Sequence, residues 1–252
     1  MAGVIRGLLG ATSLLVDFFP ILCYNKKIPM SERFTTKNGQ EIENPTEKMT
    51  YEQFRDVVSR EYGLSGDSPE ARAKQLKELS SEQVFSLMDT LNKSVQGSKD
   101  SLEQTDHAMR IGETKTIDVE HRQMVLEGVV GALRNTPDSI SAQRVGDVLA
   151  LTTAMLHPFR DGNGRTARLL GFVFHDEYDT PSEATDDYAA LAESRDDARE
   201  RGGFTLYGYI PHVPFEGFDQ SNPVQVGDYL TGLLTDETLS YTGTFGPAPL
   251  YK

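Results

Sequence analysis

The stretch HPFRDGNGRTAR runs from His157 to Arg168 and combines a histidine, an aspartate, two glycines around an asparagine, and arginines. The preceding segment, residues 141–156, places apolar side chains at the spacing of a buried helix face. The following segment, residues 167–174, is apolar nearly all round, which is typical of a buried helix. The sequence therefore predicts that the quoted stretch forms the loop and first turn between two packed helices.

The glycines of this loop favour anion binding. Gly162 and Gly164 allow positive φ and carry no side chain, so successive backbone N–H groups can turn toward one point. The helix that starts there adds free N–H groups and the positive end of its dipole. Arg165 and Arg168 are three residues apart, hence on neighbouring positions of one helix face, where they can hold adjacent phosphates.

Two further side chains suit phosphorus chemistry. Asp161 stands just before the first glycine, where one carboxylate together with phosphate oxygens and water can hold Mg²⁺. His157 is expected at the end of the preceding helix, and its near-neutral pKa suits it to remove a proton from a hydroxyl. An anion site, a metal ligand and a base at one loop predict transfer of a phosphorus-containing group. The P-loop pattern G-x-x-x-x-G-K-[ST] does not occur in the sequence.

The stretch resembles the signature of the Fic family, H-x-F-x-[DE]-G-N-G-R-x-x-R, at every defined position. The resemblance extends over about residues 80–200 and implies a mainly α fold, a Fic-type helical domain with a short β-hairpin flap. It also implies transfer of AMP from the co-substrate ATP, with Mg²⁺ as cofactor, to a Ser, Thr or Tyr hydroxyl of a target protein.

By this resemblance each signature residue has an expected role. His157 is the base, Asp161 is the magnesium ligand, and Phe159 anchors the loop in the core. The remaining residues bind the nucleotide: Asn163 as a phosphate contact, Gly162 and Gly164 as the anion-binding loop, and Arg165 and Arg168 as ligands of the triphosphate.

The segment MRIGETKTIDV, residues 109–119, alternates around Gly112 and Glu113 as a short hairpin does. Fic proteins carry a flap upstream of the signature that aligns the target backbone by strand addition. We therefore expect a target-docking flap at residues 109–116, with an ordinary connector between helices as the alternative. The flap residues are Met109, Arg110, Ile111, Gly112, Glu113, Thr114, Lys115 and Thr116.

The acidic composition limits the partners. The chain has 25 basic and 38 acidic residues, which gives a net charge of −13. A surface of this charge repels phosphate backbones, so no nucleic acid is expected as a partner. Cys23 is the only cysteine, which excludes an intramolecular disulfide and fits a cytoplasmic protein.

The N-terminal part carries an apolar run, GLLGATSLLV at residues 7–16, which is too short to be a transmembrane segment. No small-x-small cleavage site follows it, and the bulky Leu22 precedes Cys23. A helix that packs on the domain or lies at an interface is therefore favoured. Secretion or membrane association is the weaker alternative.

Composition divides the chain into three parts. Residues 1–79 are expected to form an N-terminal extension with the apolar run, a polar linker and helices, and residues 80–200 are the part that resembles a Fic domain. Residues 201–252 are rich in Gly, Pro and aromatic side chains, which predicts an irregular C-terminal segment or short β structure.

Helical periodicity is expected in several segments around the signature. The third of these begins near Ser81, which is the predicted N-cap. A further segment at 185–200 predicts an acidic helix with a solvated face. The three segments before the signature region cover residues 51–63, 69–80 and 81–95.

Regulation is where the sequence departs from the family pattern. Many Fic proteins carry an inhibitory helix, [ST]-x-x-x-E-[GN], whose glutamate pairs with the second signature arginine, here Arg168. The nearest stretch is GQEIEN, residues 39–44, where Gly39 replaces Ser or Thr and Pro45 disfavours a helix. We therefore expect either a separate inhibitory, antitoxin-like partner chain or constitutive activity.

Two alternatives to AMP transfer stay open. A related Fic transferase can move UMP, phosphocholine or phosphate with the same loop. Kinase-like relatives usually lose a loop glycine, and this chain keeps both, which favours AMP. A non-catalytic interaction module is the other alternative, although it has no reason to keep the base, the metal ligand and both arginines.

His175 and Asp176 have no companion histidines at metal-ligand spacing and are interpreted as surface polar residues.

Overall fold

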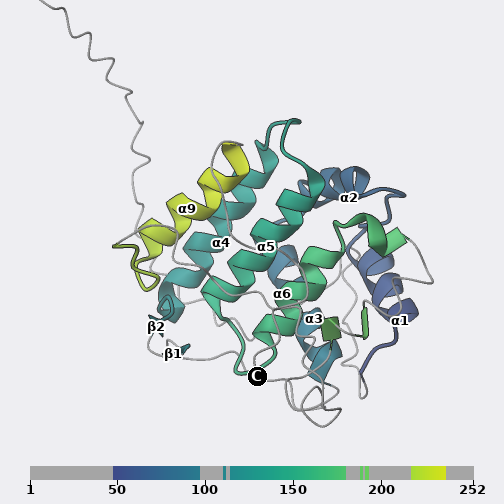
Figure 1. Cartoon of the computed structure of the whole chain (residues 1–252), viewed down its shortest axis with the longest axis horizontal. Helices are drawn as coiled ribbons and strands as arrows, with labels where there is room; N and C mark the ends of the chain where they lie inside the picture. The colour runs from purple at the N-terminus through teal and green to yellow at the C-terminus, as the bar shows by residue number, and fades with distance from the viewer. Residues whose placement is uncertain are drawn as a thin grey trace, which may run out of the picture. The chain divides into compact units, whose positions relative to one another are not determined.

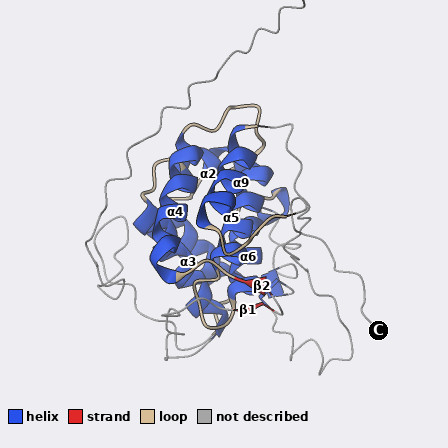
Figure 2. Ribbon diagram, turned by 90° about the vertical axis from the view of Figure 1, so that its left-hand side faces the viewer, coloured by secondary structure: helices blue, strands red, loops and turns tan. Residues whose placement is uncertain are grey.

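The computed structural model describes residues 48–96, 110–111, 114–179, 188–189, 191–192 and 217–236. This part of the chain is mostly helical, as predicted, with one short antiparallel strand pair (Figure 1, Figure 2). The elements are α1 (Tyr51–Asp56), the π-helix η1 (Val57–Glu61), α2 (Pro69–Leu76), α3 (Ser81–Gln96), β1 (Arg110–Ile111), β2 (Thr114–Lys115), α4 (Val119–Arg134), α5 (Ala142–Leu156), α6 (Asn163–Phe172), the 3-10 helix η2 (Asp176–Asp179) and α9 (Pro223–Thr235).

Helix α5 is the centre of the core. It packs against α2, α4, α6 and α9, and every residue in it except Gln143 and Arg144 is buried. Figure 1 shows α9, α4, α5 and α6 in succession across the helical body, in agreement with their pairwise contacts. Ser141 caps the helix by accepting a hydrogen bond from the Arg144 backbone N–H at 3.2 Å. The signature loop therefore lies between two helices that are almost wholly buried.

The packing of α5 on α6 depends on Gly146. A Cβ at this position would lie 2.8 Å from both the Gly171 carbonyl oxygen and the Phe174 Cβ. Both atoms belong to closely packed parts of the chain, so a larger residue would push the two helices apart. This close approach fixes the separation of the two helices that carry the signature loop.

The helices before the signature domain form close to their predicted positions. Thr50 and Gln53 make a capping box that starts α1, with the Thr50 N–H donating to Gln53 Oε1 at 2.8 Å. The predicted N-cap of α3 is wrong by one residue: Ser80 accepts from the Gln83 N–H at 3.2 Å, and the Ser80 N–H donates to Gln83 Oε1. Ser80 is therefore the N-cap residue, and Ser81 is the first residue of the helix.

A helix replaces part of the irregular C-terminal segment that the sequence predicts. Helix α9 begins after Asn222, whose Oδ1 accepts hydrogen bonds from the backbone N–H groups of Val224 and Gln225. Its apolar side chains pack on α4 and α5. Arg144 of α5 fastens its far end by donating to the Leu233 and Asp236 carbonyl oxygens at 2.8 and 2.9 Å. The prediction of irregular structure is thus wrong for residues 223–235.

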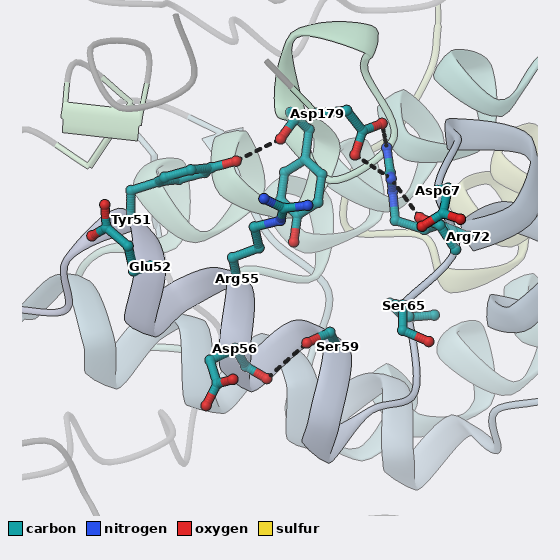
Figure 3. A pocket seen from close by; sticks show the side chains of 12 residues that line it. Tyr51, Glu52, Arg55, Asp56, Ser59, Ser65, Asp67, Arg72 and Asp179 are labelled. Atoms are coloured by element: carbon teal, nitrogen blue, oxygen red, sulfur yellow. Dashed lines mark hydrogen bonds and ion pairs between the residues drawn. The ribbon is translucent and has the colours of Figure 1, made fainter. Parts of the chain in front are cut away.

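A cleft of about 460 Å³ lies between the early helices and η2 (Figure 3). Arg72 lines this cleft and makes two hydrogen bonds to the Asp179 carboxylate, at 2.8 and 2.9 Å. Arg72 also donates to the Val173 and Gly66 carbonyl oxygens, so it joins α2 to the segment after α6. None of the residues lining this cleft belongs to the predicted active site.

Several predicted features lie outside the described residues. They include the apolar run at 7–16, the GQEIEN stretch at 39–44 and most of the acidic segment at 185–200. Of that acidic segment, residues 188–189 and 191–192 are described; Tyr188 and Leu191 are buried, and Ala189 is exposed. Within the described part of the chain, no helix has the length and apolar character needed to cross a membrane.

Candidate active site

His157 occupies the junction where α5 ends. It is the C-cap residue, with φ 44° and ψ 56°, and its backbone N–H donates to the Thr153 carbonyl oxygen at 3.0 Å. Among the described residues it is the one non-glycine residue with positive φ. A left-handed histidine is a strained conformation of the kind that folded proteins keep at functional sites. It turns the chain sharply out of the core helix.

The surroundings of His157 favour a neutral imidazole. Burial lowers its pKa from the ordinary 6.5, the Ala154 backbone opposes this shift, and the Arg122 charge lowers the pKa further. The carboxylate of Asp161 acts in the opposite direction, as the smallest of these influences. The ring atom Nδ1 is buried and makes no hydrogen bond of good geometry within the described part of the chain. A neutral imidazole at pH 7 is able to accept a proton.

Asn163 closes the loop onto Phe159. Its Oδ1 accepts from the Phe159 N–H at 3.0 Å, and its Nδ2 donates to the Phe159 carbonyl oxygen at 2.6 Å. The Phe159 ring is fully buried, with its centroid 6.0 Å from that of Phe85 in α3. The structure therefore shows Asn163 bracing the loop, while its expected phosphate contact stays a prediction.

Gly162 is the N-cap of α6 and can only be glycine in this arrangement. Its φ is 77°, and a Cβ would lie 2.2 Å from Gln96 Nε2 and 2.7 Å from Asn92 Nδ2. No side chain caps the first turn of α6. The N–H groups of that turn, beside Gly164, are of the kind that bind anions at helix ends, and anion binding here stays a prediction.

Asp161 faces solvent at the mouth of the loop. Its side chain is 70% exposed, and Oδ1 accepts from the Gly162 N–H at 2.6 Å. Its Oδ2 lies 3.3 Å from Arg165 Nη2. The carboxylate is therefore held by the loop yet open on its outer side.

Both signature arginines are brought to the start of α6. Arg165 also donates through Nη1 to the Val95 carbonyl oxygen at 3.0 Å, which ties the loop to the end of α3. Arg168 donates through Nε to the Leu191 carbonyl oxygen at 3.1 Å. The Nη1 of Arg168 lies 3.6 Å from where a Cβ of Gly164 would be, so its guanidinium sits beside the second loop glycine. The predicted cluster of base, carboxylate, glycines and arginines is thus assembled in space.

Two elements contribute residues that the sequence did not reveal. From α3, Asn92 donates to the Asp161 carbonyl oxygen at 2.8 Å and to Thr166 Oγ1 at 3.2 Å. From α4, Arg122 is 4% exposed, and burial lowers its pKa to about 10. The available signal was a polar residue within an otherwise apolar helix face, which does not by itself indicate which loop the residue meets.

The predicted flap is described only in part. β1 and β2 pair antiparallel, with Arg110 opposite Lys115 and Ile111 opposite Thr114. Thr116 follows β2 and is buried, at 0% exposure. Met109, Gly112 and Glu113 lie outside the described residues. Docking of a target on this pair stays a prediction.

His175 differs from its predicted surface position. Its side chain is 13% exposed, and Nε2 lies 3.4 Å from Oδ1 of the buried Asp147. This contact links the end of α6 to α5 and lies apart from the signature loop in sequence. It therefore belongs to the core packing.

The fold and site define a helical domain whose central helix ends at a half-buried, left-handed histidine and whose next helix begins at a glycine with positive φ. Residues 78–175 match the model of the Fic/DOC family. The family covers AMPylation and related transfer reactions. The comparison with curated proteins gives no match. The matched region begins near the predicted start at residue 80, while the predicted boundary at residue 200 is not tested by it.

Proposed function

We propose that this protein transfers AMP from ATP to a hydroxyl side chain of a target protein. The observation that carries the proposal is the placement of the half-buried, left-handed His157 close to the N-terminus of α6, which has no side-chain cap. A base and an anion-binding helix end at one loop provide both requirements of phosphoryl-group chemistry, namely proton removal and charge neutralisation.

In the proposed reaction the target hydroxyl oxygen forms a bond to the α-phosphorus of ATP. The bond from that phosphorus to the bridging oxygen of the pyrophosphate breaks, and pyrophosphate leaves with the electron pair. The hydroxyl proton passes to the His157 imidazole. Because Nδ1 is buried, we assign this role to Nε2.

The loop residues neutralise the triphosphate. The first-turn N–H groups of α6 bind phosphate oxygens near Gly162 and Gly164. Arg165 and Arg168 bring two guanidinium groups to the same end of the helix. Positive charge placed there offsets the negative charge that the leaving pyrophosphate carries.

Asp161 would hold the Mg²⁺ ion. Within the described part of the chain, no group of three His, Cys, Asp or Glu side chains is arranged to hold a metal on its own. One open carboxylate fits a magnesium ion that arrives with phosphate oxygens and water as its other ligands. When bound, such an ion supplies charge neutralisation at the phosphates.

The target and the regulator complete the proposal. The β1–β2 pair would align a target segment by strand addition. Inhibition would come from a separate antitoxin-like chain, or the enzyme would be constitutively active, because the GQEIEN stretch departs from the inhibitory pattern.

The test is labelling of proteins in a lysate by the full chain with Mg²⁺ and ATP carrying the label at either the α- or the γ-phosphate. AMP transfer predicts protein label from α-labelled ATP alone. Label from γ-labelled ATP alone would identify phosphate transfer instead. Labelled UTP and CDP-choline in parallel reactions would reveal UMP or phosphocholine transfer. No label from any donor would favour a non-catalytic module.

A further inference from the structure

Asn92 is a buried polar residue on the side of α3 that faces the signature loop. It is 1% exposed, and its helix neighbours Leu91 and Val95 are fully buried apolar residues. Polar side chains in such surroundings are costly unless they make hydrogen bonds. The presence of an amide here therefore requires an explanation from its contacts.

Its contacts join the two sides of the loop glycine. Asn92 Nδ2 donates to the Asp161 carbonyl oxygen at 2.8 Å, before the start of α6. The same nitrogen lies 3.2 Å from Thr166 Oγ1, in the first turn of α6. It is also 2.7 Å from where a Gly162 Cβ would be, so the amide packs directly against the glycine backbone. The Asn92 side chain thus contacts both Asp161 and the first turn of α6, which the proposed function assigns to phosphate binding.

We propose that Asn92 is a positioning residue for the transfer reaction, which holds Asp161 and the first turn of α6 in register across Gly162. This inference rests on the proposed function for the role of the loop. Asn92 itself acts through the loop backbone, so its loss should affect nucleotide and metal binding through Asp161 and α6.

The other half of the amide argues against a purely structural role. Asn92 Oδ1 is buried and makes no hydrogen bond within the described part of the chain. A buried acceptor without a partner destabilises the fold, and leucine of similar size would avoid that cost. Only the amide nitrogen is used, and both of its acceptors belong to the signature loop and its helix.

The test compares Asn92→Leu with Thr90→Val in the full chain. Thr90 is a matched control because it is buried on the same helix and loses one hydrogen bond, to the Tyr62 hydroxyl at 2.8 Å, away from the loop. Asn92→Ala is the second variant, since it leaves a cavity and introduces no larger side chain.

The first readout needs no nucleotide. Hydrogen exchange of the Phe159, Gly162 and Thr166 backbone amides should be about tenfold or more faster in the Asn92 variants than in wild type, because two hydrogen bonds to the loop are lost. Thr90→Val should leave these rates unchanged. Unchanged exchange in both Asn92 variants would overturn the proposal, whatever group the enzyme transfers.

The second readout is the dependence of transfer on ATP and Mg²⁺. The KM for ATP should rise about tenfold in the Asn92 variants, since the anion-binding end is no longer held, and should not rise in Thr90→Val. If the Asn92 variants show faster exchange but a KM for ATP equal to that of Thr90→Val, the positioning role is overturned. If wild type transfers nothing, the proposed function fails, and the exchange rates still decide whether Asn92 holds the loop.

Discussion

Two arginine–aspartate pairs in this structure differ in their hydrogen bonds and in the exposure of the aspartate. Arg72 binds Asp179 through two nitrogens, at 2.8 and 2.9 Å, and the Asp179 side chain is 28% exposed (Figure 3). Arg165 contacts Asp161 through one nitrogen at 3.3 Å, and the Asp161 side chain is 70% exposed. Every guanidinium nitrogen of Arg72 has a protein acceptor, two of them backbone carbonyls.

The difference separates a structural pair from one that is available to a ligand. The hydrogen-bond donors of Arg72 are saturated by protein acceptors, and the pair joins α2 to η2. The Asp161 carboxylate is braced by its own loop and leaves its outer side open. Residue type alone does not distinguish the two pairs, whereas exposure and hydrogen-bond saturation do. Substitutions at the first pair should therefore change stability, and substitutions at the second should change ligand binding.

The largest effect on stability is expected for Arg72→Ala. Removing one partner of a buried ion pair should lower the free energy of unfolding by about 3–5 kcal/mol, because the remaining carboxylate and carbonyl groups lose their donor. Arg60→Ala is the control, since Arg60 pairs with Asp56 at the surface, and should cost less than about 1 kcal/mol. Urea denaturation measures both. Equal losses, or a lower transfer rate per folded Arg72→Ala molecule, would remove the distinction between the two regions.

A smaller effect is expected when alanine replaces two left-handed glycines. Gly217 has φ 84° and open space around it, whereas Gly162 has φ 77° and contacts Gln96 and Asn92. Both substitutions carry the left-handed penalty of about 1–2 kcal/mol. Gly162→Ala should cost about 1–3 kcal/mol more, because the added Cβ overpacks the loop against α3. Unfolding free energies that match would show that the loop tolerates movement away from α3.

The open carboxylate should be detected through magnesium. Asp161→Asn keeps an oxygen for the Gly162 N–H and removes the charge, so the Mg²⁺ concentration for half-maximal transfer should rise by about tenfold. Asp179→Asn should leave that concentration unchanged while lowering stability. Titration of transfer rate against Mg²⁺ at fixed ATP measures both. An Asp161→Asn curve that coincides with wild type would exclude Asp161 as the metal ligand.

The smallest effect concerns pH. Burial lowers the pKa of His157 from 6.5, so the base should still be mostly neutral at pH 6.5. The transfer rate at pH 6.5 should therefore exceed half of its plateau value, and the pH of half-maximal rate should lie below 6.5. The unfolded chain binds this proton more readily, so the stability that His157 contributes is also lost as pH falls below 6.5. Rates measured from pH 5 to 8 decide this, and a half-maximal point at or above pH 6.5 would contradict the lowered pKa.

The signature loop was predictable because its signals are local. Glycines flanking Asn163, a histidine after an apolar helix pattern and the following apolar segment all lie within a few turns of one another. The structure confirms that one helix ends at Leu156 and that the next begins within the signature stretch, at Asn163.

The supports of the loop were not predictable in the same way. Asn92 meets Asp161 and Thr166 across 69 and 74 residues of sequence, and nothing in the periodicity of α3 names that partner. Helix α9 did carry a local signal, an Asn222–Pro223 start followed by buried apolar residues at helical spacing. The Gly, Pro and aromatic residues that surround this segment favour irregular structure, which is why composition alone predicted no helix there.

The role of His157 as the base for AMP transfer can be tested through the mass of the modified protein. Wild type and His157→Ala, at equal folded concentration with ATP and Mg²⁺, are compared by intact-mass and peptide mass spectrometry of a lysate protein that wild type labels. We expect an added mass of one AMP on a Ser, Thr or Tyr hydroxyl with wild type. Its rate of formation should be about 10²- to 10⁴-fold lower with His157→Ala. AMP addition at the wild-type rate by a folded His157→Ala protein would contradict the role of His157 as the base. An added mass of one phosphate would contradict AMP transfer.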